Sequence, residues 1–248
     1  MKKPISLITL PKPVPCRIIK RLNRFIITVQ LEDGREEPAL IRNTGRLHET
    51  LYPGAAALCI PRGKTGKTRY LLIGGNAEES KEAELIDPAT QCRAFETAAA
   101  RGLIPWLNRW QIERREITIG NSRLDYRLRS ATGEQGFLES KSAVHFTGYY
   151  TMYSDCPTER GRRHIRLLQS LRQSGYRSIL AFMAAHPDAE AFKPDVEADP
   201  DLAFSLLQAA AYGVEVYAVK MALRLDGAIL LFDPTLPVDL SRRVSLKG

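Results

Sequence analysis

Two acidic side chains and one amine stand close together in a short stretch of the chain. Residues 121–142 alternate polar and apolar side chains around a glycine-bearing turn, which predicts a β-hairpin. Asp125 lies on its first strand, and Glu139 and Lys141 lie two residues apart on its second. Because side chains alternate between the two faces of a strand, Glu139 and Lys141 share one face. The hairpin therefore predicts that these three side chains converge.

The register of this hairpin follows from the position of its turn. We expect the turn to be centred near Gly133. Antiparallel pairing about that centre places Asp125 opposite Lys141. It also places Arg127 opposite Glu139, so that charges of opposite sign face each other across the strands.

A hard divalent cation suits these residue types. Mg²⁺ takes oxygen ligands, commonly one or two carboxylates completed by water and phosphate oxygens. Asp125, Glu139 and the carbonyl of Ser140 are the expected protein ligands of Mg²⁺ or Mn²⁺. The ammonium of Lys141 would orient or deprotonate a water and offset charge on an attacked phosphate. The set predicts metal-dependent phosphodiester hydrolysis, and a solvated Glu–Lys ion pair is the alternative.

An excess of basic residues indicates a polyanionic partner. The 248 residues contain 36 Lys and Arg against 28 Asp and Glu, a formal net charge of +8. Residues 1–80 hold 14 of the basic and 7 of the acidic residues, so most of the excess is N-terminal. This charge favours a polyanionic partner, a class that includes single- and double-stranded DNA. A basic protein that binds no nucleic acid is the alternative.

Basic and polar residues in two regions are candidates for contacts to DNA. The N-terminal candidates, beside a basic loop at residues 62–69, are Arg21, Arg24, Asn43 and Arg46. Further arginines crowd the first turns of an expected helix, where cations oppose the helix dipole unless an anion compensates. The alternative for these arginines is a solvated basic face. His164, on the same expected helix, is a candidate general acid or phosphate contact, and its alternative is a purely structural role. The second group of candidates is Arg123, Arg160, Arg163 and His164.

Short β-branched or apolar runs, separated by turn residues, fill the N-terminal part. They predict five strands, at residues 17–21, 25–31, 38–42, 55–60 and 69–73. Five short strands are typical of a small barrel of the OB kind. We place this OB-like domain at residues 1–80, because an acidic patch interrupts the pattern there.

Helical and strand patterns alternate in the rest of the chain, residues 81–248. Helices are predicted at 93–101, from Thr158 to about Ser174, and from Asp199 to Gly213. Apolar runs predict strands at 176–184, 214–222 and 228–232, and we expect the acidic stretch 188–201 to be a solvated loop. The prediction is a two-domain α+β protein of the α/β class. Glu96 and Glu116, before the hairpin, compete for the role of an additional acidic residue.

The cysteines are scattered, with no spacing typical of a zinc site, which predicts a reduced cytoplasmic protein. No stretch approaches the roughly 18 apolar residues of a membrane span, so no membrane partner is expected. The oligomeric state stays open, with a homodimer among the options.

Several blocks of residues, in a fixed order, together resemble one protein family. The chain resembles the sugar fermentation stimulation protein A family over residues 17–221. That family is described as DNA-binding, with an N-terminal OB-like domain and a C-terminal domain of the PD-(D/E)xK nuclease type. The resemblance implies that Asp125, Glu139 and Lys141 are the nuclease-like trio. The matching blocks are residues 21–25, 43–47, 122–125, 139–142, 155–161 and 213–217.

Two interpretations without catalysis stay open. The family's name implies a regulator that binds DNA near sugar-utilisation genes, such as those of maltose metabolism, with the trio a structural ion-pair cluster. A protein-interaction module with an incidental basic surface is the other. Cleavage and binding of DNA, measured separately with Mn²⁺ or a chelator, distinguish the three.

Overall fold

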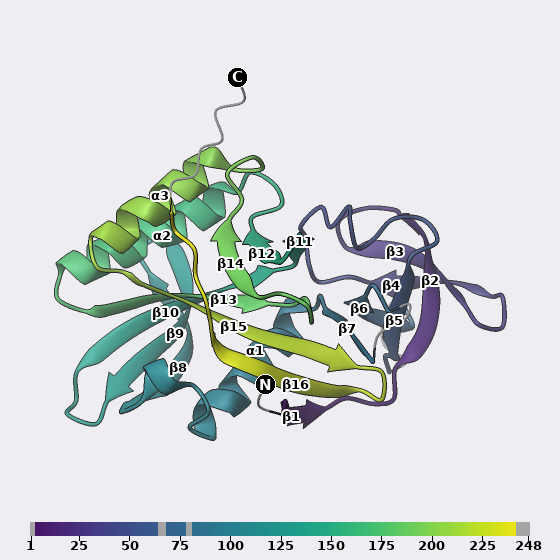
Figure 1. Cartoon of the computed structure of the whole chain (residues 1–248), viewed down its shortest axis with the longest axis horizontal. Helices are drawn as coiled ribbons and strands as arrows, with labels where there is room; N and C mark the ends of the chain where they lie inside the picture. Colours follow the sequence, from purple (N-terminus) through teal and green to yellow (C-terminus); the bar gives the residue numbers. More distant parts are fainter. Residues whose placement is uncertain (1–2, 64–67, 78–80, 242–248) are drawn as a thin grey trace.

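The computed structural model describes residues 3–63, 68–77 and 81–241. Figure 1 shows a small β-barrel beside a larger domain of strands and helices. Three features of the sequence lie outside the described residues: Lys64 and Lys67 of the basic loop, the domain boundary at residue 80, and the tail after residue 241.

Five strands form the N-terminal barrel. They are β2 (Val14–Arg21), β3 (Ile26–Leu31), β4 (Glu36–Leu40), β5 (Ala56–Pro61) and β6 (Tyr70–Gly75). Their order is β4-β3-β2-β5-β6, and β4 also pairs with β6, which closes the barrel. Ile18, Ile27 and Leu72 are fully buried, because alternate residues of each strand face the interior. The predicted OB-like barrel is confirmed.

A mixed sheet organises the second domain. In spatial order its strands are β7 (Glu82–Leu85), β15 (Glu215–Arg224), β13 (Arg177–Ala184), β10 (Gln135–Ala143), β9 (Ser122–Ser130) and β8 (Trp110–Ile119). Strands β10, β13 and β15 are parallel, whereas β8, β9 and β10 are antiparallel. Parallel neighbours need long crossover connections. These contain α2 (Glu159–Gln173), between β10 and β13, and α3 (Pro200–Ala211), between β13 and β15.

Helices cover both faces of this sheet (Figure 1). Helix α1 (Pro88–Ala100) and the short 3₁₀ helix η1 (Pro105–Leu107) pack on one face, where Phe95 contacts Trp106. Helices α2 and α3 pack on the other, where Ile165 and Leu206 join Phe182 in a separate buried cluster. The predicted α/β class of this domain is confirmed.

Two short strands connect the parts of the fold. Strand β7 pairs with β6 of the barrel and with β15, so the two sheets are continuous. Strand β1 (Ile5–Thr9) pairs with β16 (Ala228–Leu236), which itself pairs with β15. The first strand of the chain therefore adds to the second domain. The division at residue 80 stays a prediction.

Two local expectations need correction. Helix α1 begins at Pro88 rather than at residue 93, because Asp87 caps it by accepting a hydrogen bond from Thr90 N and Pro88 suits the first helical turn. The stretch 188–201 is not wholly a loop. It contains β14 (Ala191–Pro194), which pairs with β12 (Tyr150–Tyr153), and β12 pairs with β11 (His145–Thr147).

Candidate active site

Strands β9 and β10 form the predicted hairpin, in a register that differs from the predicted one. The predicted pairing of Arg127 with Glu139 is wrong, because Arg127 lies opposite Phe137. The turn is tighter than expected: Ser130 N donates to Glu134 O, and Gly133 adopts a φ of 91° within it. This short turn with a left-handed glycine moves the turn centre by one residue. Asp125 consequently lies near Glu139 rather than opposite Lys141.

The Asp125 carboxylate is held by the neighbouring strand. Ser140 donates to Asp125 Oδ2 from its backbone N at 2.8 Å and from its Oγ at 2.5 Å. Asp125 N in turn donates to Glu139 Oε2 at 3.2 Å. Burial, and then the nearby Glu139 carboxylate, raise the pKa of Asp125 above its usual value. The hairpin therefore brings two carboxylates together at the cost of mutual repulsion.

Glu139 is the centre of a buried polar cluster. Lys141 Nζ donates to Glu139 Oε1, and His164 Nδ1 lies 2.5 Å from the same oxygen. Burial opposes charge on Glu139, but Lys141 and then His164 outweigh it and keep the pKa of Glu139 below its usual value. Burial likewise opposes charge on Lys141, and Glu139 reverses this, so the pKa of Lys141 is raised. The predicted trio converges, with His164 as a fourth member.

The donor set of this cluster fits a hard cation that keeps several waters. Within the described part of the chain, no three His, Cys, Asp or Glu side chains are grouped as a cage for a metal ion. Mg²⁺ and Mn²⁺ do not need such a cage, because one or two carboxylates with water and substrate oxygens suffice. Asp125 and Glu139 provide that number, and a cation would relieve the repulsion that raises the pKa of Asp125. Ser140 anchors Asp125, and its carbonyl remains a predicted ligand.

Neither candidate for an additional acidic residue joins the cluster. Glu96, on α1, accepts a hydrogen bond from Tyr126 Oη at 2.9 Å and pairs with Arg115 at 3.2 Å. Glu116 is exposed within β8, where its carboxylate is 3.7 Å from Arg123 Nη1. Neither Glu96 nor Glu116 therefore adds a third carboxylate to Asp125 and Glu139.

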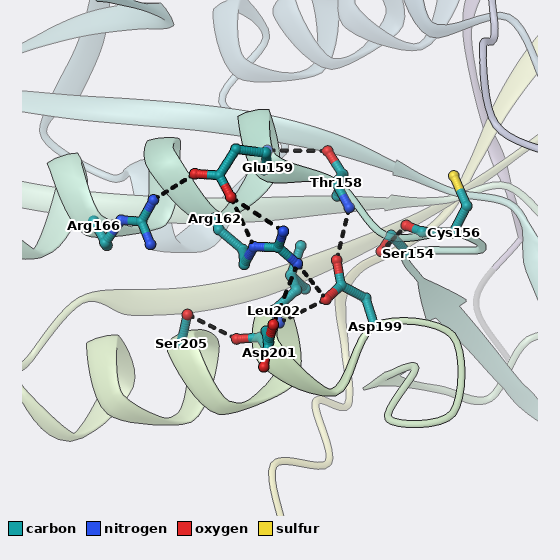
Figure 2. A network of polar contacts seen from close by, with 11 residues as sticks. Ser154, Cys156, Thr158, Glu159, Arg162, Arg166, Asp199, Asp201, Leu202 and Ser205 are labelled. Carbon is teal, nitrogen blue, oxygen red and sulfur yellow. Dashed lines mark hydrogen bonds and ion pairs between the residues drawn. The ribbon is translucent and has the colours of Figure 1, made fainter.

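Helix α2 supplies His164 and a set of arginines with two different environments. Thr158 caps the helix by accepting a hydrogen bond from Gly161 N. Figure 2 shows Arg162 between Glu159 and Asp199, with Arg166 on the other side of Glu159. These contacts neutralise Arg162 and Arg166. The sequence carried this signal, because Glu159 precedes them by three and seven residues, but the prediction overlooked it.

Arg160 and Arg163 remain exposed on the same helix. Arg163 Nε donates to Ser122 Oγ at 3.2 Å, at the start of β9, which places its guanidinium beside the hairpin that carries Asp125. His164 differs from Arg160 and Arg163 because it is buried, with only 1% of its surface exposed. Its contact is with Glu139 inside the cluster, so it does not lie on a DNA-facing surface.

Arg21 has an environment that differs from the one expected of a phosphate contact. A guanidinium has five N–H groups, and all five donate to backbone carbonyls of two barrel loops at distances from 2.5 to 3.2 Å. The geometry therefore favours a role in shaping these loops. The acceptors are the carbonyl oxygens of Asn23, Arg24, Asn43, Gly45 and Arg46.

Asn43 is also turned inward. Its Oδ1 accepts from Gly45 N at 3.0 Å, and its Nδ2 donates to Ile86 O at 3.1 Å and to Ser142 Oγ at 3.4 Å. It thereby connects the barrel loop to the end of β10. The structure brings the barrel loop against the hairpin that carries the candidate site, through a contact between residues 99 positions apart.

The remaining DNA-binding candidates, Arg24, Arg46 and Arg123, are exposed. The Arg24 guanidinium lies 4.8 Å from the ring centroid of Phe25, which is itself 44% exposed. Phe25 lies on the surface because it ends the loop before β3. An exposed ring beside an arginine suits base stacking as well as phosphate contact.

Comparison with known proteins agrees with the two-domain fold. The family model described as "Sugar fermentation stimulation protein RE domain" matches residues 89–227. The model described as "SfsA N-terminal OB domain" matches residues 19–81. The chain belongs to the sugar fermentation stimulation protein family. The family's two-domain division coincides with the barrel and the mixed sheet.

Members of this family resemble the chain over most of its length. The sugar fermentation stimulation protein homolog of Pyrococcus furiosus is 42% identical over 216 residues, 87% of this chain and 92% of that protein. The homolog of Archaeoglobus fulgidus is 39% identical over 234 residues, 94% of this chain and 99% of that protein. A solved structure of Pyrococcus furiosus SfsA in complex with Ca²⁺ has 39% identity and a TM-score of 0.89. It covers 95% of this chain and 99% of that one.

The helices carry no sign of a membrane segment. Within residues 3–63, 68–77 and 81–241, no helix combines the length and the apolar character that crossing a bilayer requires.

Proposed function

We propose that this protein is a metal-dependent phosphodiesterase that binds and cleaves DNA, with Mg²⁺ or Mn²⁺ as its cofactor. The observation that carries the proposal is the convergence of Asp125, Glu139 and Lys141 on one hairpin of the second domain. A carboxylate pair beside a buried ammonium suits the hydrolysis of a phosphodiester. The proposal places the protein in the cytoplasm, without a membrane partner.

The relative solved with Ca²⁺ supports a hard divalent cation in this fold. Asp125 and Glu139 would hold the ion, with the carbonyl of Ser140 as a predicted third ligand. When bound, such an ion polarises a phosphate oxygen and lowers the pKa of a bound water. The hard oxygen donors of this site suit Mg²⁺ and Mn²⁺ better than a soft metal.

The residues of the chain position the substrate and the proton donors around that site. Lys141 orients the attacking water and offsets negative charge on the phosphate. His164 Nδ1 contacts the same Glu139 Oε1 as Lys141 does, which keeps the carboxylate oriented. Arg160 and Arg163, exposed at the start of α2, contact the phosphates that flank the scissile bond. Arg24, Arg46 and Arg123 extend this basic surface.

Cleavage by an isosteric variant tests the proposal. Asp125→Asn keeps an oxygen that accepts from Ser140 but removes the negative charge. We expect it to lower the rate of Mn²⁺-dependent cleavage of plasmid and single-stranded DNA by about 100-fold or more. DNA affinity, measured by fluorescence anisotropy in the presence of a chelator, should change little.

Glu134→Gln is the matched control, because Glu134 lies in the turn of the same hairpin and is exposed. It should cleave DNA at the wild-type rate. Wild-type protein that cleaves nothing with either metal, or an Asp125→Asn variant that cleaves normally, would refute the assignment.

One observation favours a second candidate function, a non-catalytic DNA-binding regulator of sugar metabolism genes. Both oxygens of Glu139 already have partners within the chain, which is also the arrangement of a structural ion-pair cluster. The names of the relatives point to sugar fermentation. Binding that depends strongly on DNA sequence, combined with no cleavage in Mn²⁺, would establish this candidate.

A further inference from the structure

A pocket of about 210 Å³ lies where the barrel meets the second domain. Its barrel side is the loop that contains Asn43, Thr44 and Gly45. Its other side includes Lys141 and Ser142 of β10. The pocket therefore opens directly onto the candidate active site, and neither domain forms it alone.

The lining combines apolar walls with hydrogen-bonding groups. Leu47, Val144 and Met152 provide apolar surface, whereas Ser142 and Asp155 provide polar atoms. Flat apolar surface together with both donors and acceptors is the complement of a nucleobase, which presents a ring face and a polar edge. Tyr153, which also lines the pocket, adds an aromatic ring.

The size of the pocket limits its occupant. Pockets for drug-sized ligands measure roughly 300–1,000 Å³, and this one is smaller. It has room for one base and not for a base pair. A base that enters it must therefore be unpaired.

The hydrogen bonds and the carboxylate on the barrel side of the pocket disfavour a phosphate group there, whereas Lys141 lines the other side. The Asp155 carboxylate faces the barrel loop and would repel an anion. Gly45 N already donates to Asn43 Oδ1 at 3.0 Å, and Leu47 N donates to Asp155 Oδ2 at 2.8 Å. Two of the amides with which this turn would bind a phosphate are therefore occupied.

The barrel side of the pocket is fixed before any ligand arrives. Three donors of Arg21 hold the carbonyls of Asn43, Gly45 and Arg46 in this loop, and Leu47 N donates to Asp155 across the domain boundary. Gly45 approaches Asp155 so closely that a Cβ there would lie 2.7 Å from Asp155 Oδ2. A preformed wall of this kind lowers the entropy cost of binding.

We propose that this pocket binds one unpaired nucleobase next to the scissile phosphate. The proposal rests on the proposed function and names its substrate class: DNA that is single-stranded or contains an unpaired base. Such DNA presents a base without the cost of breaking a pair. Fully paired DNA offers only its backbone to the basic surface.

Binding without cleavage tests the pocket. Fluorescence anisotropy in a chelator compares a fully paired duplex with the same duplex carrying one unpaired base. Seating one base should make wild-type protein bind the second DNA about tenfold tighter. Thr44→Trp fills the mouth of the pocket from an exposed position and should reduce this ratio to about one. Thr147→Trp, at an exposed threonine of β11 outside the pocket, should leave the ratio unchanged.

The two proposals fail separately in this design. Equal affinity of the wild-type protein for both DNAs, or an unchanged ratio in Thr44→Trp, overturns the base pocket even if Mn²⁺-dependent cleavage is present. A tenfold preference that Thr44→Trp abolishes supports the pocket even if no DNA is cleaved. In that case only the nuclease assignment is lost.

Discussion

Replacing Glu84 by Gln should change how the stability of this protein depends on pH. Glu84 lies on β7, where the barrel joins the second domain, and only 2% of its surface is exposed. Its carboxylate accepts hydrogen bonds from Thr50 Oγ1 and Asn76 Nδ2, both at 2.8 Å. Burial outweighs these bonds and raises the pKa of Glu84 from 4.5 to about 7.

The sign and the size of the effect follow from that pKa. Between pH 4.5 and about 7, native Glu84 keeps a proton that the unfolded chain releases. Native stability therefore decreases as the pH rises through this interval, by about 1.4 kcal/mol per pH unit and about 3 kcal/mol in all. The Glu84→Gln variant is uncharged at every pH and avoids this loss. Its advantage over wild type should therefore grow by about 3 kcal/mol between pH 5 and pH 8.

A histidine next to Glu84 also titrates in this pH range. The quantity to measure is therefore the difference in the free energy of unfolding between variant and wild type. His186 Nε2 lies 3.4 Å from Glu84 Oε1, and burial lowers the pKa of His186 to about 4. This depressed pKa weakens the native state as the pH falls from 6.5, which opposes the effect of Glu84 in the wild-type curve. Subtracting wild type from variant removes the part of the His186 titration that the two proteins share.

Urea unfolding followed by circular dichroism, at pH 5, 6, 7 and 8, gives the free energies of unfolding. Glu36→Gln, at an exposed position of β4, controls for the loss of a surface carboxylate and should show a constant difference from wild type. A Glu84→Gln difference that stays constant from pH 5 to pH 8, or that shrinks, would refute the reasoning.

Two further predictions concern the domain contact and the basic surface. Gly45→Ala should lower the free energy of unfolding by about 1–3 kcal/mol, because its Cβ would collide with Asp155; urea unfolding measures this, and Gly63→Ala, with open space around it, should have almost no effect. Arg163→Gln should lower the slope of log K for duplex DNA against log salt by about 0.9, the contribution of one phosphate contact. Arg166→Gln on the same helix should leave that slope unchanged because Arg166 pairs with Glu159, and equal slopes for all three proteins would contradict the assignment of Arg163.

Local signals in the sequence were sufficient to predict features that depend only on residues close together in the chain. Glu139 and Lys141 share a face because they stand two apart on a strand, and this holds in any fold that keeps the strand. Thr158 and Asp199 start helices in the sequence and in the structure, since a cap needs only the next turn of its own helix. The predicted strands and helices follow one another in the predicted order, whereas β1, β11, β12 and β14 were not predicted.

Tertiary structure decided which of the charged residues remain available for function. Arg21, Arg162 and Arg163 look alike in the sequence, yet the first holds barrel carbonyls, the second is neutralised by acidic residues, and the third faces the hairpin. His164 joins the buried polar cluster around Glu139 only because α2 packs against the sheet. The pocket beside Lys141 exists because the barrel loop meets Asp155 from the other domain. A side chain's partners depend on segments distant in the chain, and local patterns carry no record of which distant segments will meet.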